Sequence, residues 1–149
     1  MLVEPLPFTL SLPGRDTLNL QGARSIWHRV LGLLHFDGET VTLEWSATRH
    51  LEQVSLSGVR VQDDAEEPTL LDLPLSWIAE ARVTGGWWAP RFRLRGRRLD
   101  AFDGVPGAGL GTLILKIARR DRAIAQAMAA SLAAARTLGP ADAPPQLAP

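Results

Sequence analysis

Apolar and polar residues alternate along several short stretches of the chain, which is typical of β-strands with one buried face. Residues 8–12 alternate in this way and predict an added N-terminal strand, which Pro13-Gly14 would end. Residues 26–36 include apolar residues at both odd and even positions, which predicts a strand covered on both faces. A short helix over residues 23–31 is the alternative for that segment.

The dipeptide Asp37-Gly38 separates residues 26–36 from a second alternating run at 41–45. This arrangement predicts a hairpin with a type I′ turn, in which both central residues have positive φ. Alternation continues over residues 54–61 but changes phase at Gly58, which predicts a bulge or bend. Residues 63–68 are acidic and end in proline, and they predict a solvated loop.

The next predicted strands contain the most unusual pattern in the chain. Leucines at positions 71, 73 and 75 lead into a strand over 77–84, which Gly85-Gly86 interrupts. After Trp87-Trp88, arginines at positions 91, 93 and 95 alternate with Phe92 and Leu94, so one face of this strand is cationic and the other apolar. Gly96-Arg97 predicts a turn back into residues 99–102, and a last strand covers 112–117.

A helix over about 121–137 closes the predicted order of elements. Ile124, Met128 and Leu132 recur every four residues and form an apolar stripe. Asp121 suits the N-cap, and Gly139-Pro140 is a stop signal. We therefore expect one domain over residues 1–138, followed by a disordered Pro/Ala-rich tail at 139–149. The expected class is mainly β (α+β), a bent antiparallel sheet or small barrel closed by one C-terminal helix.

Three segments in this order resemble bacterial pleckstrin-homology-like domains of the GRAM-related kind. They are the strand entry Leu73–Ala81 (LPLSWIAEA) before an arginine-rich hairpin, the strand Gly111–Ile117, and Arg119–Arg122 (RRDR) before the helix. The resemblance covers residues 30–138. It implies a seven-stranded barrel of two packed antiparallel sheets with a closing helix, and a binding or assembly module. Phosphoinositide-binding members carry clustered basic residues on the first hairpin, whereas this hairpin turn, residues 36–39, is acidic.

Composition narrows the expected functions. Sixteen basic residues balance sixteen acidic ones, so no net field attracts nucleic acid, and any anion binding must come from a local patch. No cysteine is present, which removes thiol chemistry and fits a reducing compartment. The N-terminus has no basic region before an apolar run, and no apolar run approaches the length of a membrane span. We expect a cytoplasmic location and no transmembrane segment.

Candidate catalytic and cofactor chemistry is sparse. The glycine-rich stretch 104–111 precedes a β-branched run and not a helix, so it predicts a connecting loop and not a phosphate cradle. His28 and His35 are an odd number of residues apart on one predicted strand, so their side chains would point to opposite faces. No carboxylate lies at metal-ligand spacing from these residues or from His50. We expect no enzyme activity, no cofactor and no metal site.

The tryptophan pair and the arginines remain as candidate binding residues. Guanidinium groups side by side suit carboxylate or phosphate ligands, whereas a solvated, charged strand edge is the simpler alternative. Exposed tryptophans beside them would form an interfacial or protein-binding anchor, and buried ones would belong to the core. The first hypothesis is a protein-binding module that also self-associates, and the second is peripheral binding of anionic lipid or phosphorylated ligand. The candidate residues are Trp87, Trp88, Arg91, Arg93, Arg95 and Arg98.

Overall fold

The computed structural model describes residues 3–19 and 22–138. These residues are mainly β, with an antiparallel sheet and a C-terminal helix, which confirms the predicted class at this level. The strands are β1 (Leu6–Asn19), β2 (Gly22–Phe36), β3 (Thr40–Ser55), β4 (Gly58–Ala65), β5 (Thr69–Pro74), β6 (Ile78–Thr84), β7 (Arg91–Gly96) and β8 (Thr112–Lys116). Short 3₁₀ turns at Leu75–Trp77 (η1) and Arg119–Asp121 (η2) precede β6 and the helix α1 (Arg122–Leu138).

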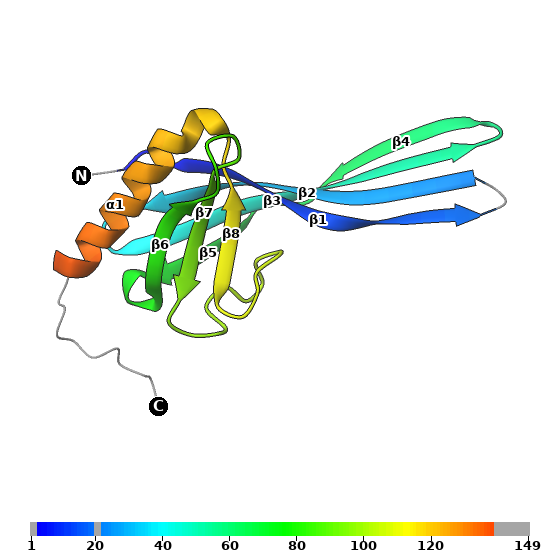
Figure 1. Ribbon diagram of the computed structural model, residues 1–149. Coiled ribbons are helices and arrows are strands. Elements are labelled where there is room, and N and C mark those ends of the chain that lie inside the picture. The colour runs from blue at the N-terminus through cyan, green and yellow to red at the C-terminus, as the bar shows by residue number, and fades with distance from the viewer. Residues whose placement is uncertain (1–2, 20–21, 139–149) are drawn as a thin grey trace.

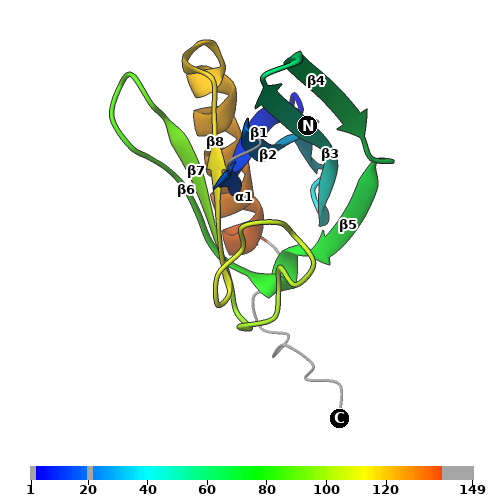
Figure 2. The same ribbon diagram turned by 90° about the vertical axis from the view of Figure 1, so that its right-hand side faces the viewer.

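The strands form one strongly bent sheet with the order β4-β3-β2-β1-β8-β7-β6, and β5 pairs with β3 beside β4. The two halves of this sheet are joined at one residue pair, Thr9 with Lys116. Figure 2 shows the halves facing each other, with β6, β7 and β8 on one side. Because β4 and β6 end the order and do not pair, the sheet is not closed into the predicted barrel of two separate sheets.

The core fills the space between the two halves of the sheet. It is built from the inward positions of the alternating strands, such as Phe8, Leu34 and Leu43 facing Phe92 and Leu113, all buried. The predicted helical stripe is confirmed at Met128 and Leu132 of α1, which are completely buried together with Ala125, whereas Ile124 is only partly buried. The helix packs mainly along β6 and covers one end of the bent sheet (Figure 1).

Beyond the core, the first four strands continue as a long projection that Figure 1 shows clearly. We call it the arm, and it comprises residues 11–19, 22–29, 47–55 and 58–65. The described side chains of β3 from Ala47 onward are half-buried or exposed, and those of β4 are all exposed. The arm is therefore a four-stranded sheet whose described side chains form no core of their own.

The arm corrects three sequence predictions. Pro13-Gly14 does not end the first strand, because β1 continues to Asn19 and absorbs these two residues as a register shift between Leu12 and Arg15. Gly58 is not a bulge but the first residue after a two-residue turn, since Ser55 pairs with Gly58. Residues 63–65 belong to β4 and not to an acidic loop.

Other segments differ from the prediction in detail. Residues 23–31 are strand, so the helical alternative is wrong. The β2–β3 hairpin is confirmed, but Asp37 does not have the positive φ of a type I′ turn. Residues 99–102 form turns in which Ala101 and Phe102 are buried, not a strand. The helix begins one residue later and ends one residue later than predicted. The predicted tail, 139–149, lies outside the described residues.

Candidate functional site

The turn between β6 and β7 presents the tryptophan pair at one end of the molecule. Gly85 has φ +81°, and a Cβ there would lie 2.4 Å from the carbonyl oxygen of Ala89, so only glycine fits this tight reversal. The N–H of Ala89 donates to the carbonyl of Gly86 at 3.2 Å and closes the turn. Figure 1 shows this turn beside the beginning of α1.

Both tryptophans of this turn face solvent. Trp87 is 60% exposed and Trp88 is 77% exposed, so neither belongs to the core. The N–H of Ile117 donates to the carbonyl of Pro90 at 3.0 Å, which extends the β7–β8 ladder and brings Trp88 next to the segment before α1. The structure thus settles the alternative left open by the sequence: the indole rings are surface groups.

Two arginines at the start of the helix stack on these rings. The guanidinium carbon of Arg119 lies 4.2 Å from the centroid of Trp88 and 5.2 Å from that of Trp87. That of Arg122 lies 5.7 Å from the Trp87 ring, and its Nη1 donates to the carbonyl of Gly86 at 3.3 Å. Cation–π contacts of this exposed kind contribute about 0.5–1 kcal/mol each. They hold the β6–β7 turn against the helix.

The outer face of β7 continues this basic surface. In the sheet register Arg91 lies opposite Lys116 of β8, and Arg93 lies opposite Arg82 of β6. Like charges placed directly opposite each other destabilise a sheet. Within the described part of the chain, the side chains of Arg91, Arg93 and Lys116 form no hydrogen bond or ion pair. An anion bound between them would relieve this repulsion.

The other two predicted arginines are engaged within the molecule. Arg95 lies 3.6 Å from Glu80, which also pairs with Arg82 at 3.2 Å. Arg98 sits past the opposite end of β7, pairs with Asp100 at 3.0 Å and stacks on the Trp77 ring at 5.5 Å. The structure therefore gives Arg95 and Arg98 acidic partners, whereas Arg91 and Arg93 have none among the described residues and lie near Trp87 and Trp88.

An open hollow of about 630 Å³ adjoins the tryptophan pair at the beginning of the helix. Three of its six lining residues are arginines; the lining residues are Trp87, Arg119, Arg120, Arg122, Ala123 and Gln126. Arg120 projects outward with 89% of its side chain exposed. We call the combined surface the tryptophan–arginine face, and it consists of Trp87, Trp88, Arg91, Arg93, Lys116, Arg119, Arg120 and Arg122.

Sequence reasoning missed half of this face. Lys116 was treated only as part of the last strand. The segment Arg119-Arg120-Asp121-Arg122 was used for the family resemblance and for the start of the helix, and not as a binding surface. The signal that could have found them is the antiparallel order of β7 and β8. Such a pair places the first residues of one strand beside the last residues of the next.

Comparison with protein-family models, curated proteins and solved structures gives no significant match. The resemblance to pleckstrin-homology-like domains therefore stays a prediction. Among the described residues, no helix has the length and apolar character needed to cross a membrane.

Proposed function

We propose that this protein is a non-enzymatic binding module that docks on anionic membrane surfaces through the tryptophan–arginine face. The observation that carries the proposal is the position of two adjacent exposed indole rings on the tip of a turn bordered by basic side chains. Self-association, the other hypothesis, finds its support at a different surface, the edge of the arm.

The two residue types on this face have complementary effects at a membrane. Tryptophan favours the interfacial zone of a bilayer, because its large apolar ring carries one polar N–H. Basic residues near an anionic bilayer contribute about 1 kcal/mol each to binding. A turn that presents Trp87 and Trp88 ahead of Arg91 and Arg119 would insert the rings and leave the charges at the headgroups.

The basic side chains of the tryptophan–arginine face form a local patch around β7 and the start of α1. The arm carries charges of both signs, with Arg24, Arg29 and Arg60 besides Glu52, Asp63 and Asp64. A local basic patch can attract an anionic surface even when the net charge of the chain is zero.

Sedimentation with lipid vesicles tests the proposal. The protein should bind vesicles containing phosphatidylserine, bind pure phosphatidylcholine weakly, and lose binding as salt is raised. The double variant Arg91→Gln/Arg93→Gln should lower the partition coefficient roughly 30-fold, at about 1 kcal/mol for each basic residue removed. Both positions face away from the core, so the variant should fold normally.

Arg24→Gln/Arg29→Gln is the matched control, because it removes the same two charges from exposed positions on the arm, and its binding should be unchanged. Equal binding by Arg91→Gln/Arg93→Gln and the wild-type protein would refute the membrane proposal. Titration with water-soluble glycerophosphoserine separates the alternative: saturable binding of this compound without vesicles would point to a phosphorylated ligand in place of a membrane.

A further inference from the structure

The outer edge of β4 is open for pairing. β4 ends the strand order of the sheet, and all eight of its residues are exposed. The N–H of Glu66, just beyond the strand, donates to the carbonyl of Ala47 on β3 at 2.8 Å. Backbone groups alternate in direction along an antiparallel ladder, so the N–H and C=O groups of residues 58, 60, 62 and 64 also face β3. The N–H and C=O groups of Val59, Val61, Asp63 and Ala65 therefore point to the open edge.

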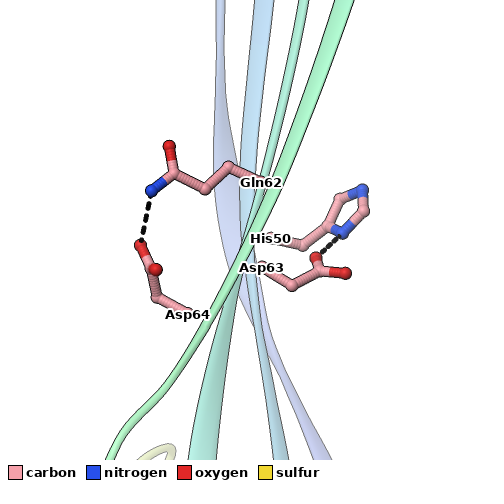
Figure 3. A network of polar contacts seen from close by, with 4 residues as sticks. All are labelled: His50, Gln62, Asp63 and Asp64. Carbon is pink, nitrogen blue, oxygen red and sulfur yellow. Dashed lines mark hydrogen bonds and ion pairs between the residues drawn. The ribbon is translucent and has the colours of Figure 1, made fainter.

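The side chains of β4 divide between the two faces of the arm. Figure 3 shows Gln62 and Asp64 on one side of the strand and Asp63 with His50 on the other. Gln62 Nε2 donates to Asp64 Oδ2 at 3.5 Å, and Asp63 contacts His50 Nδ1. Arg60 shares the face of Gln62 and Asp64, and its side chain forms no ion pair with any described residue. One face of the edge thus carries the order Arg, Gln, Asp.

We propose that two copies of this chain pair β4 against β4, antiparallel, across a two-fold axis at Gln62. In this register Arg60 lies opposite Asp64 of the second copy, and the same pair recurs on the other side of the axis. Val59 and Val61, both exposed, then face Ala65 and Asp63 of the second copy with their outward backbone groups aligned for hydrogen bonding. The two arms become one continuous eight-stranded sheet.

The charges select this register over its neighbours. A shift that centres the axis on Val61 places Arg60 opposite Gln62 and removes both ion pairs. A shift that centres it on Asp63 sets two carboxylates against each other, which is unfavourable. The symmetric order of charges is the reason to propose a second copy of the chain as the occupant, because one strand supplies both members of each pair. Pairing of like edges also closes at a dimer.

Light scattering coupled to size-exclusion chromatography of the full chain, over a dilution series without lipid, tests the proposal. The wild-type protein should have twice the 16.2 kDa mass of one chain. Arg60→Asp and Asp64→Arg should each raise the dissociation constant at least about tenfold, because two attractive pairs become two repulsive ones. An equimolar mixture of the two variants should recover a dimer, since one edge then carries only acids and the other only arginines.

Arg24→Asp is the control, because it makes the same charge change on the same face of the arm, two strands from the edge. It should dimerise like the wild-type protein. If either single variant does not fold, the double variant Arg60→Asp/Asp64→Arg is tested in its place. It should dimerise, because the acid at position 60 again lies opposite an arginine at position 64 of the second copy. The proposal is overturned by a wild-type monomer at every concentration. It is equally overturned by an undiminished dimer of Arg60→Asp, or by a mixture that stays monomeric.

Discussion

The carboxylate of Asp37 organises the hairpin between β2 and β3. Its Oδ1 accepts the N–H of Thr40 at 2.7 Å and the N–H of Glu39 at 2.8 Å. These bonds favour the ionised form, so they lower the pKa of Asp37 below its ordinary value of 3.8, with the Thr40 bond contributing most. The Asp-Gly pair therefore predicted the hairpin correctly, but the side chain of Asp37 and not a type I′ backbone closes the turn.

The stability of the hairpin should depend on the charge of Asp37. Because the pKa is lowered on folding, the contribution is complete above the ordinary pKa of 3.8 and is lost as the pH falls through the folded value. Asp37→Asn keeps an oxygen acceptor but does not titrate. We expect the urea midpoint of the wild-type protein to exceed that of the variant at neutral pH, and the difference to shrink in acid. A difference independent of pH would contradict this assignment.

Among the elements, β2 lies between β1 and β3, and Gly32 is a point of close contact with both neighbours. A Cβ at this position would lie 2.3 Å from the Phe8 ring of β1 and 2.5 Å from the carbonyl oxygen of Glu44 in β3. Phe8 is buried over the glycine, so the ring cannot move aside freely. The glycine thus permits the close packing of the Phe8 ring against β2 and β3 near the place where the core ends and the arm begins.

Gly32→Ala should destabilise the protein by about 1–3 kcal/mol, the range for overpacking a filled core. Gly109→Ala is the control, because no atom lies within 4 Å of its added Cβ and its φ is not positive. It should be neutral or slightly stabilising. Urea denaturation of both variants compares the free energies of unfolding. Equal stability of the two would show that Phe8 and β3 relax around the extra methyl group.

Most individual strands were predictable, but the arm was not. Alternation identifies a strand by its buried face, as in residues 41–45 of β3, where every second side chain is buried. In the arm the described side chains form no buried face, and Pro13-Gly14 and Gly58 were interpreted as interruptions within separate short strands. Sequence also could not show that β1 joins the halves through Thr9 and Lys116, because pairing between distant strands depends on the whole fold.

At the scale of the whole molecule, half of the residues of the candidate site could be predicted from the sequence. Trp87, Trp88, Arg91 and Arg93 stood together in the chain, and the structure keeps them together. Arg95 and Arg98 share the same local pattern, but Glu80 and Asp100 neutralise them, and these partners depend on strand register and turn geometry. Arg119 belongs to the site because β8 ends beside the tryptophan turn, and this position could not be predicted from the sequence.

The two proposed surfaces lie on different parts of the molecule. The tryptophan–arginine face belongs to the body, around β7 and the start of α1, and the β4 edge belongs to the arm (Figure 1). A dimer formed through the arms would carry two membrane-binding faces, and binding of one would raise the effective concentration of the other where the geometry allows both to touch the bilayer. Each surface can nevertheless be tested without the other.

Quenching of tryptophan fluorescence by brominated lipid chains tests the central claim most directly. In anionic vesicles with brominated acyl chains, the emission of the wild-type protein should fall, because Trp87 and Trp88 enter the bilayer interface. A Trp87→Phe/Trp88→Phe variant that is still bound should be quenched much less, since the three remaining tryptophans, Trp27, Trp45 and Trp77, belong to other elements than the β6–β7 turn. Equal quenching of the two bound proteins, or no quenching of the wild-type protein, would contradict docking through the tryptophan–arginine face.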